Sequence, residues 1–253
     1  MTAIDFSPAP GAATAWRRVV SHGLTESRLL VRNGEQLLLA LVIPIGILLA
    51  GRLVGGRFGT MDTLAPSVMA LAIWSSSFTS LAIATGFERR YGVLERLAPT
   101  PLGKLGLLAG KALSLVLVVV GQLVVVGVVA VIAGWRPGWT VPSALGMLLV
   151  AVLGIATFAC LAVTMAGRLR AEATLALANL VYVVFLAVGA LLLPVAGYPD
   201  VVQPLIRLLP TAALGEGLRA GSSGVLLGWP FLVLLVWLAV GATAAWRGFR
   251  WTS

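Results

Sequence analysis

The chain has 253 residues, of which 59% are hydrophobic and 11% are charged, and its formal net charge is +9. Soluble domains carry about 25% charged residues, so this composition excludes an ordinary soluble domain and indicates an integral membrane protein. With one Cys and one His, the sequence also excludes a disulfide framework and a zinc site.

The N-terminal region divides into two parts. Residues 1–15 contain Pro8, Pro10 and Gly11 but no basic residue, which favours a flexible lead-in over a signal peptide. Residues 16–32 form an amphipathic helix when plotted at ~100° per residue. Its apolar side carries Trp16, Val19, Val20, Leu24, Leu30 and Val31, and its polar side carries Arg17, Arg18, Arg28 and Arg32. Such a helix before a span is expected to lie in the cytoplasmic membrane interface. His22, on the polar side, is either a solvated residue or a pH switch.

Six uncharged windows follow, at 36–51, 63–87, 112–135, 137–167, 173–199 and 220–246. Five exceed the ~20 residues that a helix needs to cross the hydrocarbon core, and Arg52 can reach the interface from the end of the shorter first window. The windows show no alternation typical of barrel strands. The sequence therefore predicts an all-α polytopic membrane protein with helices at about 36–54, 64–87, 107–133, 143–167, 174–193 and 224–246.

The orientation follows from the Lys and Arg residues. With the N-terminus inside, thirteen of the eighteen lie on the inner side: Arg17, Arg18, Arg28, Arg32, Arg89, Arg90, Arg96, Lys104, Lys111, Arg168, Arg170, Arg247 and Arg250. We therefore expect a multi-pass plasma-membrane protein with both termini in the cytoplasm. The positive charge indicates topology and contact with the lipid bilayer, and not nucleic-acid binding.

A charged segment, residues 88–101, separates the second and third windows. Phe87, Tyr91, Leu94 and Ala98 follow helical spacing, which predicts one apolar stripe on a short helix that Pro99 and Pro101 end. One interpretation is a solvated loop that obeys the positive-inside rule. The aromatic stripe and the mixed charges favour the other, a docking element for a second protein.

Polar residues within the spans are candidates for a translocation path, because on lipid they would lack partners. The candidates are Ser76, Thr79, Gln122, Asn179 and Tyr182. The alternative is hydrogen bonding between helices. No span carries a charge at its centre, which favours an amphipathic or lipid-like substrate.

The segment 194–223 contains four prolines, so we expect outer helices too short to span. Glu216 and Arg219 are three residues apart and can pair across one helical turn, or belong to a gate. Gly106 and Gly110, near the inner end of the third span, have the spacing that permits close helix approach.

The segment Glu88-Arg89-Arg90-Tyr91-Gly92-Val93-Leu94-Glu95-Arg96-Leu97, followed by Thr100-Pro101-Leu102 and Gly110-Lys111, resembles the loop between spans two and three of ABC-2 type transporter permeases. A second resemblance comprises Asn179, Leu193-Pro194, Pro210, Glu216 and Arg219. The sequence departs from the family before Pro194, where many members have a Ser-Gly pair. In order and topology the resemblance covers nearly the whole chain, as one ABC-2 transmembrane domain at 1–253.

The resemblance implies the membrane half of an ABC exporter, which pairs with a second permease, identical or homologous, and docks ATPase subunits. The coupling residues would be Glu88, Arg89, Arg90, Tyr91, Gly92, Leu94, Glu95 and Arg96, with Arg168 and Arg170 as a second contact. An outer gate would include Pro210, Glu216 and Arg219. The family dimer uses spans one and five.

The chain has no phosphate-binding loop, since Gly103-Lys104 is followed by Leu105. We therefore expect no cofactor in this chain and no catalysis by it, with ATP and Mg bound by the partner ATPase. The expected substrate is a hydrophobic or amphipathic drug, antibiotic or lipid. Intramembrane catalytic clusters and an internal repeat are absent, which disfavours a membrane enzyme and a secondary transporter. A non-transporting assembly or anchoring protein is the alternative.

Overall fold

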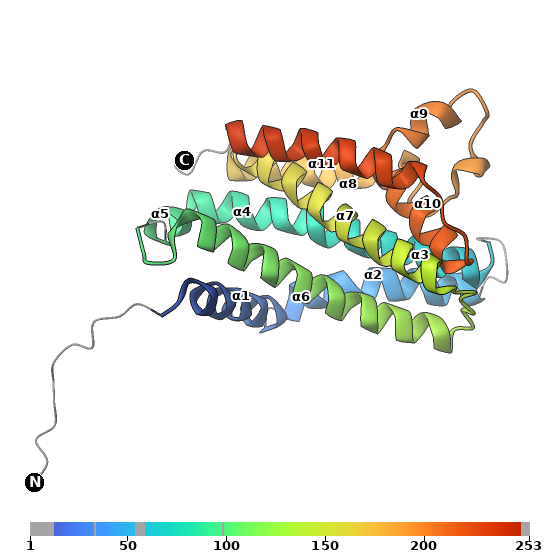
Figure 1. Ribbon diagram of the computed structural model, residues 1–253, viewed down its shortest axis with the longest axis horizontal. Coiled ribbons are helices and arrows are strands. Elements are labelled where there is room, and N and C mark those ends of the chain that lie inside the picture. Colours follow the sequence, from blue (N-terminus) through green and yellow to red (C-terminus); the bar gives the residue numbers. More distant parts are fainter. Residues whose placement is uncertain (1–12, 33, 54–58, 98, 249–253) are drawn as a thin grey trace, which may run out of the picture.

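The computed structural model describes residues 13–32, 34–53, 59–97 and 99–248, and every regular element within these ranges is a helix. The predicted all-α fold class is therefore confirmed (Figure 1). In chain order the elements are α1 (Ala15–Arg32), α2 (Gly34–Leu53), α3 (Met61–Trp74), η1 (Ser75–Ser80), α4 (Leu81–Arg90), α5 (Val93–Leu97), α6 (Gly103–Ile132), α7 (Val141–Ala166), α8 (Ala171–Val188), η2 (Val195–Gly197), α9 (Gln203–Arg207), α10 (Pro210–Ser222) and α11 (Trp229–Gly248).

Five stretches of the described chain are long and apolar enough to cross a membrane: Met61–Arg90, which joins α3, η1 and α4, then Leu105–Ile132, Val141–Ala166, Ala171–Val188 and Trp229–Gly248. The apolar part of α2, Ala40–Leu53, is shorter than a span of ~20 residues. Five of the six predicted spans thus meet the length criterion, and the count of six depends on α2.

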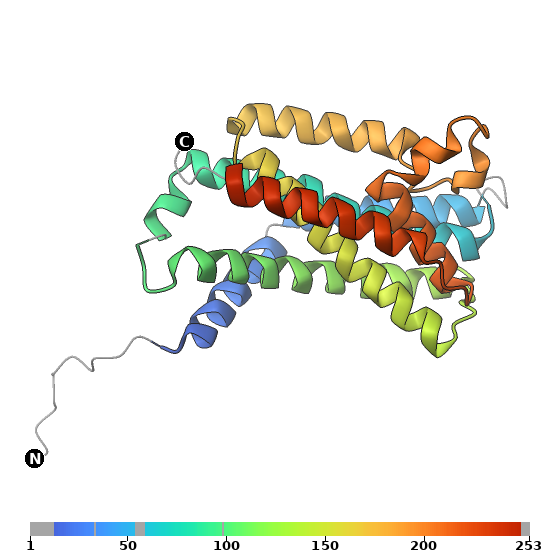
Figure 2. The same ribbon diagram turned by 45° about the horizontal axis from the view of Figure 1, so that its top comes forward.

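The stretch Met61–Arg90 is the central helix of the bundle. About two-thirds of its best apolar window is buried, 67%, against 17% for α8. The long helices α6, α7 and α8 pack beside it, and α11 packs on α7; all four run roughly along the long axis of the bundle (Figures 1 and 2). Apolar side chains such as Val124 on α6 and Leu148 on α7 remain exposed, as expected for helices whose outer faces contact lipid.

The bundle has two distinct ends. At one, which we call the α5 end, lie α1, α5, the start of α6 and the C-terminal end of α11; at the other, the α10 end, lie α9 and α10 (Figure 1). At the α10 end, the indole of Trp135 donates a hydrogen bond to Ser222 Oγ at 3.1 Å, and the amide of Arg136 donates to Asp62 Oδ1 at 2.9 Å. These bonds fix the α6–α7 connection against α10 and α3.

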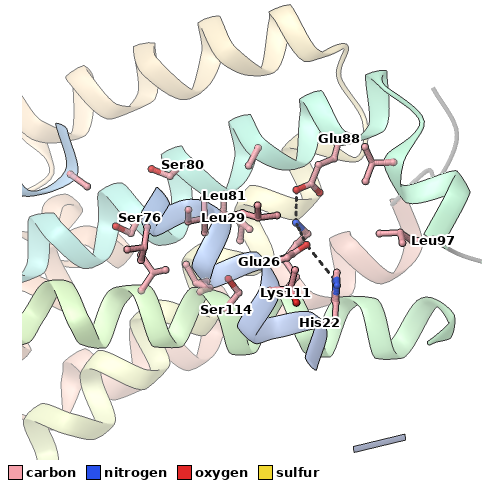
Figure 3. A pocket seen from close by; sticks show the side chains of 18 residues that line it. His22, Glu26, Leu29, Ser76, Ser80, Leu81, Glu88, Leu97, Lys111 and Ser114 are labelled. Carbon is pink, nitrogen blue, oxygen red and sulfur yellow. Dashed lines mark hydrogen bonds and ion pairs between the residues drawn. The ribbon is translucent and has the colours of Figure 1, made fainter. Parts of the chain in front are cut away.

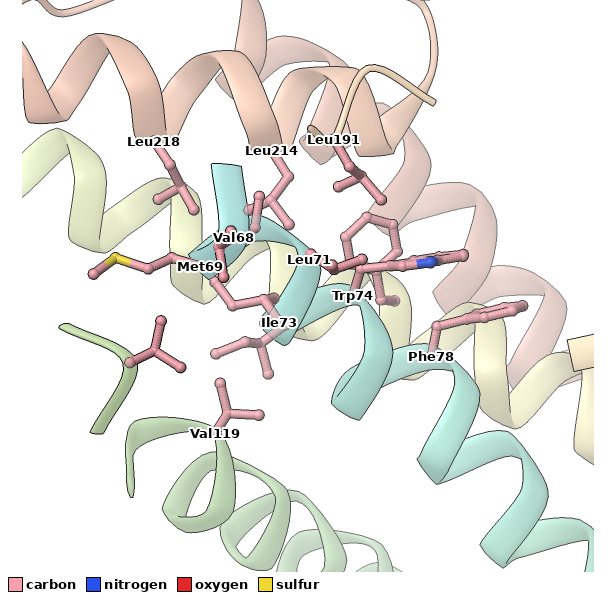
Figure 4. Packing of buried hydrophobic residues seen from close by; sticks show 14 of the residues in the cluster. Val68, Met69, Leu71, Ile73, Trp74, Phe78, Val119, Leu191, Leu214 and Leu218 are labelled. Carbon is pink, nitrogen blue, oxygen red and sulfur yellow. The ribbon is translucent and has the colours of Figure 1, made fainter. Parts of the chain in front are cut away.

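The core is built around α3. Trp74 stacks on Phe78 with ring centroids 4.4 Å apart and meets Phe158 of α7 edge-on at 4.8 Å. Leu71 lies in the same cluster, and Leu214 of α10 packs against it from the α10 end (Figure 4). α10 therefore contributes apolar side chains to the core of the bundle, and these side chains pack against the central helix.

A six-residue π-helical turn, η1, interrupts the central helix at Ser75–Ser80. Such turns are rare and often occur at functional sites. The polar residues Ser76 and Thr79 fall within it. Ser76 faces α6 from this turn, where it bonds to Gln122.

The predicted span boundaries differ most from the structure at the end of the fifth span and the start of the sixth. The fifth span was expected to reach residue 193, but α8 ends at Val188. The backbone turns at Ala190, which has a positive φ of 52°, so the carbonyls of Ala190 and Leu191 point at Arg219 instead of continuing the helix. The sixth helix begins at Trp229, with Pro230 in its first turn, and not at residue 224.

Candidate functional site

The α5 end carries the charged segment, and here the chain makes a sharp elbow. The helix α4 ends at Arg90, Tyr91 and Gly92 form a turn, and the short helix α5 follows. Gly92 has a φ of +66°, a left-handed conformation that favours glycine. The predicted single helix with one apolar stripe is therefore wrong, because the turn at Gly92 sends Tyr91 and Leu94 in different directions.

The elbow residues fall into two groups. Leu94 and Arg89 are buried, with exposed fractions of 2% and 7%. In contrast, Tyr91 is 63% exposed, and the side chains of Arg90, Glu95 and Arg96 are exposed too. Leu94 and Arg89 hold the elbow to the bundle, and the exposed residues form its outward surface.

Arg89 fastens α4 to the connection between α7 and α8. Its guanidinium donates hydrogen bonds to the carbonyl of Ala166, the last residue of α7, and to the carbonyl of Leu169 at 3.1 Å. The last carbonyls of a helix lack intrahelical partners and carry partial negative charge, so a buried cation is favourable there. Arg89 thereby links α4 to the end of α7 and to the connection that leads into α8.

The predicted second contact lies beside the elbow. Arg90 pairs with Glu172 in the first turn of α8, but both side chains are at least half exposed, and such surface pairs contribute little. Arg168 and Arg170 are exposed in the same connection. The structure therefore gathers the two predicted contacts at the α5 end.

A group of four charged or titratable residues joins α1, α4 and α6, and we call it the ion cluster: His22, Glu26, Glu88 and Lys111 (Figure 3). Lys111 Nζ lies 2.7 Å from Glu88 Oε1 and 3.5 Å from Glu26 Oε1, and His22 Nε2 lies 3.3 Å from Glu26 Oε1. The sequence did not predict that His22 belongs to a charged cluster. The His22 side chain is only 14% exposed, so the interpretation of His22 as a solvated residue is wrong.

The helix α1 packs on α6 through glycines. A Cβ built on Gly23 would lie 2.8 Å from the carbonyl oxygen of Gly110, and a Cβ on Gly110 would lie 2.5 Å from His22. A Cβ on Gly106 would approach Val19. The predicted close-approach motif at Gly106 and Gly110 is therefore occupied by α1 of the same chain.

Besides the face that packs on α6, α1 has an apolar face and a basic face, and both are exposed. Trp16 is 71% exposed and Val31 is 54% exposed on the apolar face, while Arg17, Arg28 and Arg32 are exposed on the polar face. Arg18 donates a hydrogen bond to the carbonyl of Pro101, just after the elbow. α1 thus has one face for α6, one apolar face and one basic face.

The candidate path residues do not form one site. Ser76 Oγ donates to Gln122 Oε1 at 2.7 Å, and Gln122 Nε2 donates to the carbonyl of Ala40 at 2.7 Å. These bonds tie η1, α6 and α2 together, which favours the helix-to-helix interpretation for this pair. Asn179 lies on the exposed side of α8. The other two lie deeper, as Thr79 is buried in η1 and Tyr182 is half-buried on α8.

At the α10 end, Glu216 and Arg219 form the predicted pair at 3.0 Å. Arg219 also donates to Ser67 Oγ and to the carbonyls of Ala190 and Leu191, each at 2.9 Å. Burial lowers the pKa of Arg219, and the neighbouring Glu216 carboxylate opposes this by favouring the charged form.

Glu216 extends the same network, since its carboxylate accepts a hydrogen bond from the amide of Val195 at 2.7 Å. Pro210 is buried at the start of α10, where proline suits the first helical position. Glu216 and Arg219 thus belong to one network that joins α3, α10 and the chain after α8.

Sequence reasoning missed Glu26, Lys111 and Ser67 as partners. Lys111 lies far along the sequence from Glu26 and Glu88, and Ser67 lies far from Arg219, so no local pattern connects them. Only His22 and Glu26 have local i,i+4 spacing. One sequence signal could have identified two of them. Glu26 lies beside the apolar side of the helix at residues 16–32, and Lys111 directly precedes the uncharged window 112–135, and charges in such places usually have a partner. Within the residues that the structure describes, no group of three or more His, Cys, Asp or Glu could hold a metal ion.

A bundle with five candidate spans defines a polytopic membrane protein, and its charged elbow is braced against three of its helices. Residues 56–247 match the model of the ABC-2 family transporter protein, and the chain belongs to this family of permeases. Family membership places it in the plasma membrane as a multi-pass ABC transporter subunit and implies association with an ABC ATPase.

The chain is also similar to curated relatives. Two of these are the probable doxorubicin resistance ABC transporter permease protein DrrC from Mycobacterium tuberculosis, strains CDC 1551 / Oshkosh and ATCC 25618 / H37Rv. Each is 27% identical over 252 residues, and the alignment covers 93% of this chain and 90% of the relative. The similarity extends over nearly the full length of both chains.

Proposed function

We propose that this chain is the membrane-spanning permease of an ATP-driven exporter, which moves a hydrophobic or amphipathic drug, antibiotic or lipid out of the cytoplasm. A separate ATPase subunit would bind ATP and Mg and supply the energy. The family match and the relatives named for doxorubicin resistance support an export role. The sparse charge of the spans favours an apolar or amphipathic substrate.

In this proposal the α5 end faces the cytoplasm. Thirteen of the eighteen Lys and Arg residues then lie on the inner side, as the positive-inside rule requires, and both termini are cytoplasmic. α2 completes the spans as the sixth. α1 lies in the inner interface, with Trp16 in the acyl boundary and Arg17, Arg28 and Arg32 at the headgroups.

The elbow carries the proposal. Its outward surface offers Tyr91, Glu95 and Arg96 to a partner, while its buried side is fastened elsewhere. Arg89 holds the α7–α8 connection, and Glu88 holds α6 through Lys111. A movement of the elbow would therefore be transmitted to α4, α6, α7 and the start of α8. Coupling to an ATPase needs such an arrangement.

The test is charge reversal on the outward surface. The variant Glu95→Lys should reduce ATP-driven export strongly while membrane insertion stays intact, because docking depends on complementary charge. The matched control is Asp200→Lys, which reverses an exposed carboxylate at the α10 end. Export and ATPase activity are measured on the co-expressed permease and ATPase in vesicles. Normal assembly and export by Glu95→Lys would refute the coupling assignment.

Co-purification separates the exporter from the alternative, a membrane assembly or anchoring protein. The exporter predicts that an ATPase subunit co-purifies with this chain and that its hydrolysis depends on the chain. A stable permease without such a partner would refute the exporter.

The same proposal includes a second permease subunit. α8 is the least buried of the five candidate spans, and its exposed side includes Asn179 as well as Leu180 and Val183. We place the contact with an identical or homologous permease on this face together with α2. Cross-linking of Cys introduced at Leu180 would test it, with Cys at Leu148 on the exposed side of α7 as the control.

A further inference from the structure

A cavity of about 350 Å³ lies between α1, α2, α6 and the central helix at η1 and α4 (Figure 3). This volume is at the lower end of the range for small-molecule sites. Its walls are mostly apolar and include Leu29, Leu30, Leu81, Ala84, Leu115 and Val118. Ser76 lies at one end and Glu88 at the other, a separation of roughly 18 Å along a helix at ~1.5 Å per residue.

The ion cluster forms the charged end of this cavity. Two acidic side chains, Glu26 and Glu88, share a single ammonium, Lys111. Glu88 Oε2 is buried and has no hydrogen-bond partner among the described residues. Buried polar atoms are rarely left unsatisfied, so this oxygen is an acceptor without its donor.

A second polar group points to the same conclusion. Ser114, which lines the cavity one turn from Lys111 on α6, is only 1% exposed. Its hydroxyl also lacks a partner within the described part of the chain. The cavity therefore combines an apolar body, an unsatisfied carboxylate oxygen at one end and an unsatisfied hydroxyl beside it.

We propose that this cavity binds a cationic amphiphile, with a cationic N–H group at Glu88 Oε2 and its apolar body along Leu81, Ala84 and Leu115. The inference rests on the proposed function and specifies the charge class of the substrate. An anion would meet two carboxylates whose only Lys is already paired. A neutral lipid would leave Glu88 unsatisfied.

Binding is tested on the purified chain in phosphatidylcholine nanodiscs, without any ATPase. The probe is the cationic dye rhodamine 6G, followed by fluorescence anisotropy against empty nanodiscs, with the anionic dye fluorescein as the comparison. Glu88→Gln should weaken rhodamine 6G binding about tenfold or more, the usual value of a charge-assisted bond. Asp200→Asn, which neutralises an exposed carboxylate, should leave the affinity unchanged.

A second variant covers the case in which Glu88→Gln fails to fold. Ala84→Phe fills the cavity with an uncharged side chain and should weaken binding, while Ala242→Phe on the exposed side of α11 should not. Folding of each variant is checked by thermal unfolding. Equal binding of fluorescein and rhodamine 6G, or unchanged rhodamine 6G affinity in folded Glu88→Gln and Ala84→Phe, would overturn the proposal.

These readouts are independent of the Glu95→Lys experiment. A chain that couples to an ATPase but does not bind rhodamine 6G in this cavity refutes only the binding site. A chain that binds the dye but has no ATPase partner refutes only the exporter.

Discussion

Arg219 of α10 donates a hydrogen bond of 2.9 Å to the hydroxyl of Ser67 on α3, joining two residues that are far apart in the sequence. Both side chains are buried. Through the further bonds of Arg219 to Ala190, Leu191 and Glu216, one guanidinium holds α10 and the end of α8 against the central helix. This cation therefore adds a polar link between α10 and α3 to the apolar packing of Leu214 and Leu218.

Removing this cation should destabilise the protein. Arg219→Met would leave the Glu216 carboxylate without its cation, and breaking such a buried pair costs about 3 kcal/mol or more. Thermal unfolding of the purified protein in detergent measures the loss. Arg207→Met removes an exposed arginine from neighbouring α9 and should leave the melting temperature unchanged. Equal stability of the two variants would contradict the network.

A methyl group at Gly23 should separate α1 from α6. In Gly23→Ala the new Cβ would lie 2.8 Å from the carbonyl oxygen of Gly110 and 3.0 Å from the Leu113 side chain. A backbone atom cannot give way as a side chain can, so we expect a loss of about 1–3 kcal/mol from overpacking. The control is Gly121→Ala in α6, where no atom lies within 4 Å.

The control variant should behave in the opposite sense. Alanine is a better helix former than glycine by about 1 kcal/mol, so Gly121→Ala is expected to keep or raise the melting temperature. If Gly23→Ala were as stable as Gly121→Ala, α1 would not pack on α6 through Gly23.

The apolar helices were predictable because the membrane imposes a length and composition that single windows reveal. The C-terminal end of α8, at Val188, could not be predicted in this way. It is set by Arg219, whose bonds to Ala190 and Leu191 cross 28 or more residues. A distant side chain that binds backbone carbonyls in this way leaves no pattern in the sequence near the end of the helix.

The elbow shows the same limit. Sequence spacing placed Tyr91 and Leu94 on one stripe, and the charges of residues 88–96 marked the segment as functional. Spacing cannot show that Gly92 turns the chain, or that Arg89 finds the end of α7. The sequence therefore singles out this segment as a candidate docking element, but it does not show which of its residues face outward.

Neighbouring arginines at the elbow should differ sharply in stability. Arg89→Met removes a buried guanidinium from the carbonyls of Ala166 and Leu169, and hydrogen bonds to charged groups contribute ~1.5–3 kcal/mol each. Arg90→Met removes only an exposed pair with Glu172, worth at most ~1 kcal/mol. Chemical denaturation of both variants in the same detergent gives the comparison. A larger loss in Arg90→Met would refute the bracing role of Arg89.

The pair of Ser76 and Gln122 offers a choice between structure and substrate contact. If Gln122 joins helices, Gln122→Leu should lower stability by about 1 kcal/mol, in the range measured for hydrogen bonds between membrane helices. Ser76→Ala should then add little in the Gln122→Leu background, because the two side chains share one bond of 2.7 Å. If Gln122 instead contacts substrate, Gln122→Leu would leave thermal stability unchanged and raise the KM of export. Unfolding of the four proteins of this double-mutant cycle, beside export kinetics of Gln122→Leu, separates the two roles.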